Sequence, residues 1–250
     1  MKGRIVITTQ PADRARGLME QLQLKGARAM NMPLIKTRTQ LLPEASFGNL
    51  FMNYRPDLLV FTSSKGVRGF FENLAHATGS YSLPYPVAIA VVGPATASEV
   101  ENYSSKVTYI NPGNDALALA GFLKKEVLKP EDKVLLALGN LAPGFLEEDL
   151  CDAAQVRRIN VYETILLKPE DTEPARLIRQ GKADMVVFTS PSAFSSFLNH
   201  FAGCPSVPMA AIGSTTAAAI REAGHEVAVT SSSPTAEQLA NAVKNFFKGH

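Results

Sequence analysis

The sequence predicts an α/β protein made of two similar domains, each built on a parallel sheet. Three features predict this fold: short apolar strands alternate with amphipathic helices, one segment repeats in the two halves of the chain, and hydroxyl-rich turns follow the strands. Alternating strands and helices favour a parallel sheet that helices cover on both faces.

The repeat is clearest where Asp57–Ser63 recurs 127 residues later as Asp184–Ser190. After both segments, apolar residues recur at i, i+3, i+4 and i+7, the spacing of one helix face. They are Val67, Phe70, Phe71 and Leu74 in the first copy and Phe194, Phe197, Leu198 and Phe201 in the second. Val92–Ala97 then matches Ile212–Ala217 at a spacing of 120 residues, which indicates a loop that differs in length by seven residues.

The flanking segments repeat more weakly. Arg4–Ile7 resembles Lys133–Leu136, and a helical stretch follows each of them. The next strands are predicted at Met32–Ile35 and Asn160–Ile165, whereas residues 146–156, which contain Cys151, are expected to be helical. Each half therefore follows the strand and helix order of a flavodoxin-like domain.

Two domain divisions fit the repeat. The chain could be cut once near Lys129–Asp132, which gives two domains in tandem. It could instead cross twice between the domains, with paired linkers around Ile35–Thr39 and Thr164–Lys168. The turn-rich, acidic stretch Pro169–Pro174 is consistent with such a crossing.

Hydroxyl side chains gather where strands end and helices begin. The turns concerned are Thr62–Ser64, Gly93–Thr96, Gly139–Asn140, Thr189–Ser192 and Gly213–Thr216. In a parallel sheet these turns share the carboxyl edge, where ligands usually bind. The N–H groups of a first helical turn attract anions such as carboxylates.

A single turn of this kind is explained by helix capping, because Ser and Thr are preferred caps. Several such turns, duplicated in two domains, favour a cleft that holds a ligand with several negative charges. No turn matches GxxxxGK[ST] or GxGxxG, and no GxSxG or HExxH motif occurs. Nucleotide binding and the common hydrolase sites are therefore not supported.

The composition excludes other classes. Lys+Arg 25 against Asp+Glu 23 leaves a net charge of +2, without the basic stripe of a nucleic-acid binder. Two cysteines and four isolated histidines predict neither a disulfide framework nor a zinc site. The apolar stretches are too short for a secretory signal or a membrane helix, so we expect a cytoplasmic protein that does not bind membranes.

Tyr162 lies at the centre of an expected strand, between Val161 and Ile165. A tyrosine in such a place is often a packed strand residue. If it instead points from a linker into a cleft between the domains, its phenol can act as a proton donor.

Taken in order, these segments resemble the uroporphyrinogen-III synthase family over nearly the whole chain. The segments that carry the resemblance are Pro33–Ile35, Val60–Ser64, Val92–Ala97, Gly139–Leu141, Val161–Thr164, Phe188–Ser192, Ala211–Ala217, Ala223–Val227 and Ser233–Thr235. The resemblance implies two flavodoxin-like domains joined by a two-stranded linker, one from residues 1–35 plus 170–250 and the other from 38–166. It also implies cyclisation of hydroxymethylbilane, a linear tetrapyrrole, with inversion of the last ring and loss of water.

The resemblance further implies that no metal or organic cofactor is used, and we expect a monomer. Tyr162 matches the family tyrosine proposed to assist loss of the hydroxyl. The positions that match substrate-binding turns are Thr62, Ser63, Ser64, Thr96, Gly139, Asn140, Ser190, Ser192, Gly213, Thr215 and Thr216.

The chain departs from the family pattern at two places. Thr9-Gln10-Pro11 stands where many members have Thr-Arg-Pro, and apolar residues flank the Gly139 turn where many have a basic residue. Lys65 and Arg68 could replace those cations or could be solvated helix charges. Two other functions therefore stay open: a non-catalytic binding or regulatory protein for an anionic small molecule, and a receiver-like module. The sequence disfavours a receiver-like module, because the first strand ends in Thr8-Thr9-Gln10 rather than in acidic residues.

Overall fold

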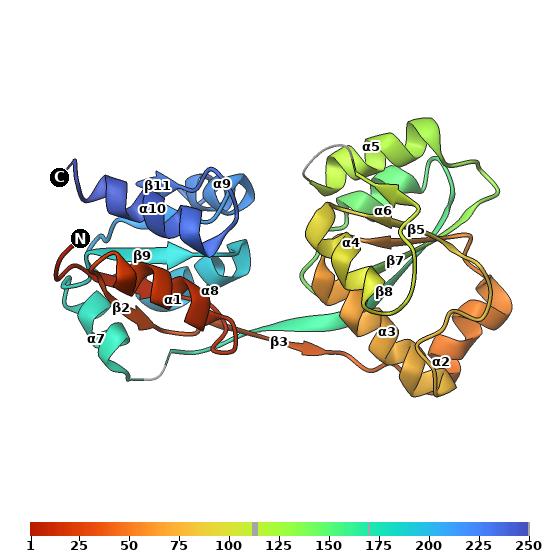
Figure 1. Ribbon diagram of the computed structural model, residues 1–250, viewed down its shortest axis with the longest axis horizontal. Helices are drawn as coiled ribbons and strands as arrows, with labels where there is room; N and C mark the ends of the chain where they lie inside the picture. Colours follow the sequence, from red (N-terminus) through yellow and green to blue (C-terminus); the bar gives the residue numbers. More distant parts are fainter. Residues whose placement is uncertain (112–114, 170, 250) are drawn as a thin grey trace. The chain divides into compact units, whose positions relative to one another are not determined.

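The computed structural model describes residues 1–111, 115–169 and 171–249 (Figure 1). The chain folds into two compact units. Unit 1 comprises Met1–Thr37 and Ile165–His250, and unit 2 comprises Arg38–Thr164. The chain thus leaves unit 1, builds all of unit 2 and returns.

Unit 1 is built on a five-stranded sheet in the order β11-β10-β9-β1-β2, and all its pairings are parallel. Its strands are β1 (Ile5–Thr8), β2 (Arg28–Asn31), β9 (Met185–Phe188), β10 (Met209–Ala211) and β11 (Val229–Thr230). Its helices are α1 (Ala15–Leu24), α7 (Glu173–Arg179), α8 (Pro191–Phe201), α9 (Ser214–Glu222) and α10 (Ala236–Phe246).

Unit 2 carries a six-stranded sheet in the order β3-β8-β7-β4-β5-β6. Its strands are β3 (Ile35–Thr39), β4 (Leu58–Phe61), β5 (Ala88–Val91), β6 (Tyr109–Ile110), β7 (Lys133–Gly139) and β8 (Gln155–Leu166). Its helices are α2 (Glu44–Asn49), a π-helical turn (Leu50–Tyr54), α3 (Ser64–Thr78), α4 (Pro94–Glu101), α5 (Ala116–Glu126) and α6 (Phe145–Leu150).

The internal repeat corresponds to a repeated fold. Strands that are equivalent in the repeat occupy equivalent positions in the two sheets. The order is β2-β1-β9-β10-β11 in unit 1 and β8-β7-β4-β5-β6 in unit 2. In unit 1 this is the flavodoxin-like order 2-1-3-4-5 along the chain; unit 2 has the same spatial order, but its equivalents of the first two strands, β7 and β8, come last in the chain. The predicted fold class, two parallel α/β domains of this type, is confirmed.

Both faces of each sheet are buried, as parallel sheets require. Residues that alternate along a strand enter two different clusters: in β7, Leu135 packs with α3, whereas Leu136 packs with α5 and α6. Phe61 of β4 meets Phe70 of α3 at a ring-centroid distance of 5.4 Å. These contacts fix the ends of the strands, where the predicted site residues lie.

The two crossing segments, β3 and β8, pair with each other. Gln40 N donates to Val161 O at 3.0 Å, and Leu167 N donates to Leu34 O at 2.9 Å. Gln40, late in the first segment, pairs with Val161, which is early in the second, and Leu34 pairs with the later residue Leu167. The two segments therefore run antiparallel. They form a two-stranded linker, as the family resemblance implied.

Two local predictions are wrong. The second strand of unit 1 is Arg28–Asn31 rather than Met32–Ile35, because Pro33 has no N–H to donate and the chain leaves the sheet there. The helix expected over 146–156 ends at Leu150, and Gln155 already begins β8. No helix in the described ranges is long and apolar enough to cross a membrane.

Candidate functional site

The turn between β4 and α3 places Thr62, Ser63 and Ser64 at the carboxyl edge of unit 2, and all three are half-buried. Ser63 is the N-cap of α3, and its Oγ accepts a hydrogen bond from Gly66 N at 3.2 Å. Ser64 Oγ donates to Ala95 O at 3.0 Å, which ties the first turn of α3 to that of α4. The first turn of α3 therefore has a fixed position at this edge.

The turn between β9 and α8 in unit 1 has the same geometry. Ser190 caps α8, its Oγ accepts from Ala193 N at 3.2 Å, and it lies 3.2 Å from Ser192 Oγ. The backbone angles of the two caps agree within a few degrees, at φ −159° and ψ 154° for Ser63 and φ −162° and ψ 153° for Ser190. Both turns thus present the positive end of a helix with hydroxyls beside it.

A second pair of turns precedes α4 and α9. Thr96 and Thr216 are only 4% and 3% exposed, whereas Thr215 is exposed. Gly93 has a φ of +82°, which favours glycine, but Gly213 at −174° is simply extended. A ligand at these turns would meet helix amides and Thr215, while Thr96 and Thr216 lie beneath the surface.

Gly139 and Tyr162 are in contact at the end of β7. A Cβ placed on Gly139 would lie 2.8 Å from Tyr162 Oη, and closer still to the ring. The Tyr162 ring therefore occupies space that only a glycine leaves free. Tyr162 is half-buried, and within the described ranges its hydroxyl makes no hydrogen bond to another residue.

A β-bulge aims Tyr162 at this position. Leu138 pairs with Asn160 but Gly139 pairs with Tyr162, so Val161 is an extra residue in β8. Consecutive residues of a regular strand point to opposite faces. Here Val161 and Tyr162 both pack on the cluster that holds α3. The bulge thus brings the phenol to the α3 side of Gly139.

The side chain of Asn140 holds the end of β8. Its Oδ1 accepts from Thr164 N at 2.8 Å, and its backbone N donates to Tyr162 O at 3.1 Å. Asn140 thereby continues the strand pairing past the bulge. Its side chain supports the strand that carries Tyr162, and this role was not foreseen from the sequence.

Two further residues were missed, Gly66 and Gly69 of α3. A Cβ on Gly66 would lie 2.6 Å from Ala137 O, and one on Gly69 would overlap the Val161 carbonyl. The spacing of three residues puts both glycines on one helix face. They let the start of α3 approach the ends of β7 and β8 closely. A Gly-x-x-Gly spacing at a helix start was the available signal.

Arg68 is held by Glu99, which its guanidinium contacts with both Nε and Nη2 at 3.2–3.3 Å. This pair joins α3 to α4 across the two turns. This contact favours the interpretation of Arg68 as a charge on the helix surface over its interpretation as a cation that binds the ligand. Among the described residues, no three His, Cys, Asp or Glu side chains gather as metal ligands would.

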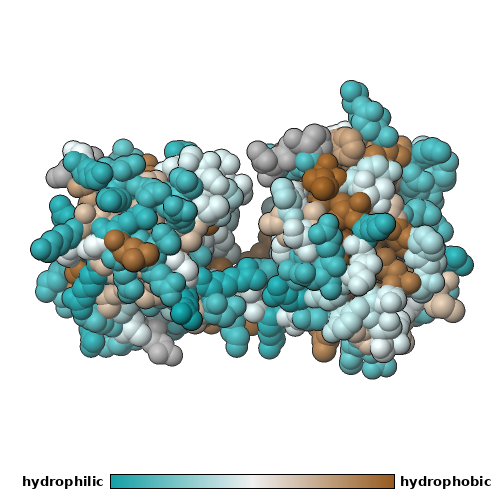
Figure 2. All heavy atoms as spheres, in the orientation of Figure 1, coloured by the Kyte–Doolittle hydropathy of each residue, from teal (hydrophilic) through white to brown (hydrophobic). Residues whose placement is uncertain are grey.

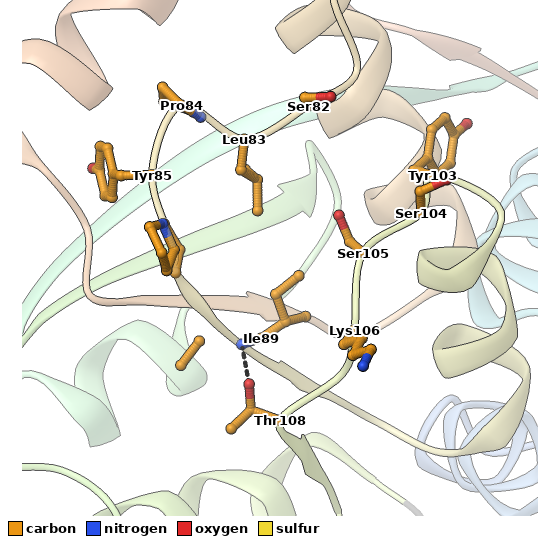
Figure 3. Close-up of a pocket in the computed structure, with 13 residues that line it drawn as sticks. Ser82, Leu83, Pro84, Tyr85, Ile89, Tyr103, Ser104, Ser105, Lys106 and Thr108 are labelled. Atoms are coloured by element: carbon orange, nitrogen blue, oxygen red, sulfur yellow. Dashed lines mark hydrogen bonds between the residues drawn. The ribbon is translucent and has the colours of Figure 1, made fainter.

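A pocket with a volume of about 790 Å³ lies at the amino edge of the unit 2 sheet, opposite the predicted site residues (Figure 3). The loops before β5 and β6 line it from opposite sides, Leu83 from one and Ser105 from the other, and Ile89 N donates to Thr108 Oγ1. Burial raises the pKa of Tyr85 and Tyr103 in its wall, because it disfavours the charged phenolate. A smaller pocket of about 470 Å³ occupies the matching place in unit 1. No predicted site residue lines either pocket.

Comparison with known proteins points to one family. Residues 17–241 match the family model described as Uroporphyrinogen-III synthase HemD. A uroporphyrinogen-III synthase of Chlorobaculum parvum (strain DSM 263 / NCIMB 8327) is 26% identical over 235 residues, which cover 90% of this chain and 91% of that protein.

Two solved structures share the fold. A mutant uroporphyrinogen III synthase of the extremely thermophilic bacterium Thermus thermophilus is 16% identical with a TM-score of 0.72, over 98% of this chain and 100% of that one. Uroporphyrinogen-III synthetase from Helicobacter pylori 26695 is 18% identical with a TM-score of 0.65, over 97% of this chain and 99% of that one.

Proposed function

The chain belongs to the uroporphyrinogen-III synthase family, and we propose that it cyclises hydroxymethylbilane to uroporphyrinogen III in the way described below. The reaction closes a linear tetrapyrrole with inversion of its last ring and loss of water. The match of the family model to residues 17–241 carries this assignment. Chemistry is assigned to the end of β7, because Tyr162 lies there against Gly139 beside capped helix termini.

The substrate carries acetate and propionate groups, and the helix starts at the carboxyl edge of each unit are suited to bind carboxylates. A carboxylate near a helix N-terminus gains about 0.3–1 kcal/mol, and up to about 2 kcal/mol when partly buried. Each of the four duplicated turns, those that precede α3, α4, α8 and α9, can supply this much for one carboxylate. A chain with a net charge of only +2 can therefore bind a strongly anionic substrate.

Apolar side chains next to these turns suit the pyrrole rings. Ile110 at the end of β6, Leu117 in the first turn of α5 and Leu141 after β7 are each more than half exposed. All three lie at the carboxyl edge of unit 2, and Figure 2 shows much hydrophobic surface on this unit. Contact with apolar rings would remove this surface from water.

Tyr162 would assist the departure of the hydroxyl group. The bond between the hydroxymethyl carbon and its oxygen breaks, and the electron-rich terminal pyrrole supplies the electrons that stabilise the carbon. The phenol gives its proton to the leaving oxygen, which departs as water. The proton that the closing ring later loses restores the phenol. The helix termini hold the bilane in one conformation, which decides the isomer.

A product assay tests this function. Hydroxymethylbilane is added to the protein, and the oxidised porphyrin isomers are separated; unaided closure, which gives the isomer without ring inversion, is the control. We expect isomer III to dominate, also after dialysis against a chelator. A product mixture equal to the enzyme-free control, together with calorimetric binding of the product, would favour the non-catalytic binding protein instead.

A further inference from the structure

Arg158 of β8 places its guanidinium at the carboxyl end of β7. It lies in β8, opposite Leu136 of β7, and it is half-buried. Its Nη2 donates to Gly139 O at 2.9 Å, and its Nε donates to Asn160 Oδ1 at 3.1 Å. The side chain therefore reaches forward along the sheet to the residue that contacts Tyr162.

Within the described ranges, no carboxylate lies within 4.0 Å of Arg158. The neighbouring Arg157 lies over the Tyr54 ring at 4.3 Å, and Arg68 is bound to Glu99. Arg158 is thus a fixed positive charge beside the candidate site without an anionic partner in the described structure. Partly buried charges are normally paired.

The turn at Gly139 does not need Arg158 to satisfy its carbonyl. Gly139 O already accepts a hydrogen bond from Ala142 N at 3.0 Å. Two of the five N–H groups of the guanidinium are used by Gly139 and Asn160, which orient its plane. The remaining N–H groups form a fork of the kind that binds carboxylates.

Arg158 and Tyr162 flank Gly139 from opposite faces of the sheet. Paired residues of parallel strands share a face, so Arg158 lies on the side of Leu136, which packs with α5 and α6. Tyr162 packs on the cluster that holds α3. A substrate held at Gly139 would meet the phenol on one side and the guanidinium on the other.

We propose that Arg158 binds a carboxylate of the substrate and so places the reacting end of the bilane against Tyr162. This inference rests on the proposed function. It also explains why the Gly139 turn itself needs no basic residue, because the neighbouring strand β8 supplies the cation. Arg158 is assigned to substrate binding, whereas the proton transfer stays with Tyr162.

The test compares Arg158→Gln and Arg158→Lys with the matched control Arg157→Gln, which removes the same charge one residue away on the other face. KM and kcat are measured with hydroxymethylbilane, and affinity for uroporphyrinogen III is measured by anaerobic calorimetry. We expect Arg158→Gln to raise KM and weaken product binding about 10- to 100-fold, the usual effect of losing a hydrogen bond to a charged group. Arg158→Lys should recover much of this loss, and Arg157→Gln should stay near the wild type.

Equal loss in the Gln and Lys variants would overturn the proposal, because a purely structural contact to Gly139 is lost in both. Unchanged KM and affinity in Arg158→Gln would overturn it as well. Thermal unfolding of each variant shows whether the fold is kept, and the Lys variant keeps the test valid if Arg158→Gln unfolds. Failure of the proposed function is seen separately, as absence of isomer III from the wild type, while the binding measurement still tests Arg158.

Discussion

The carboxyl edges of the two units share their scaffold but differ in what it carries. Over Phe61–Phe70 and Phe188–Phe197 the sequence of buried, half-buried and exposed residues is the same at all ten positions. The equivalent strands β1 and β7 end differently: β1 leads into Gln10, whereas β7 ends at Gly139. Gln10 Oε1 is buried without a hydrogen-bond partner in the described structure, while Gly139 makes room for the Tyr162 ring. In the proposed function the duplicated helix starts bind carboxylates, and the single glycine makes room for the tyrosine that donates the proton.

The equivalent helices α3 and α8 also differ in whether they carry glycines where they pack on the sheet. Gly66 and Gly69 of α3 correspond in the repeat to Ala193 and Ser196 of α8. Ser196 is buried, and its Oγ donates to Leu167 O at 3.1 Å. Unit 1 thus accommodates side chains where unit 2 has only backbone. Unit 2 is packed more closely around Tyr162, which limits the positions that the phenol can take.

The largest expected effect is that of Gly139→Ala, which removes the main difference between the strand ends. The added Cβ would overlap the Tyr162 ring, so the phenol must move. A displacement of about 1 Å commonly costs about 100-fold in rate, and we expect a loss of kcat of at least this size. Steady-state kinetics with hydroxymethylbilane measures it.

The matched control is Gln10→Ala in unit 1. It removes a buried oxygen that has no partner among the described residues, so the free energy of unfolding should change by no more than about 1 kcal/mol and kcat should stay near the wild type. Equal losses of kcat in the two variants would show that the strand ends do not differ in function.

A second prediction concerns the close approach of α3. Gly69→Ala gains about 1 kcal/mol of helix propensity. The new Cβ meets the Val161 carbonyl, which Gln40 N holds in place, so it cannot be accommodated by a side-chain movement. The overlap should dominate and lower the free energy of unfolding by about 1–3 kcal/mol, with a fall in kcat.

Ser196→Ala is the counterpart in unit 1. It removes one hydrogen bond and should cost about 1 kcal/mol without changing kcat. Denaturant unfolding and kinetics are measured on both variants. A Gly69→Ala variant that is more stable than the wild type would mean that α3 does not pack tightly on β8.

The smallest effects are expected for the two caps. Ser63→Ala and Ser190→Ala each remove one hydrogen bond of the same length and geometry. Each should lower the free energy of unfolding by about 1 kcal/mol and raise KM modestly. Denaturant titration compares them directly, and a difference between them of more than about 1 kcal/mol would show that the scaffolds are not equivalent.

The features that sequence alone could predict are those that rest on local patterns. The repeat of Asp57–Ser63 in Asp184–Ser190 predicted the duplicated sheets, and the Ser63 and Ser190 caps follow from residue type and position. The contact of Tyr162 with Gly139 could not be predicted, because it depends on an extra residue in β8 that shows only when the strands are paired. The reach of Arg158 to Gly139 O likewise depends on register rather than on spacing along the chain.

The most direct test of the account is the kinetics of Tyr162→Phe. Phe keeps the ring that packs against Gly139 and removes only the hydroxyl, so the fold and the binding turns are left intact. If Tyr162 is the proton donor, kcat falls about 100-fold or more, while KM and product affinity stay close to the wild type. An unchanged kcat would contradict it, because the proton would then come from another group.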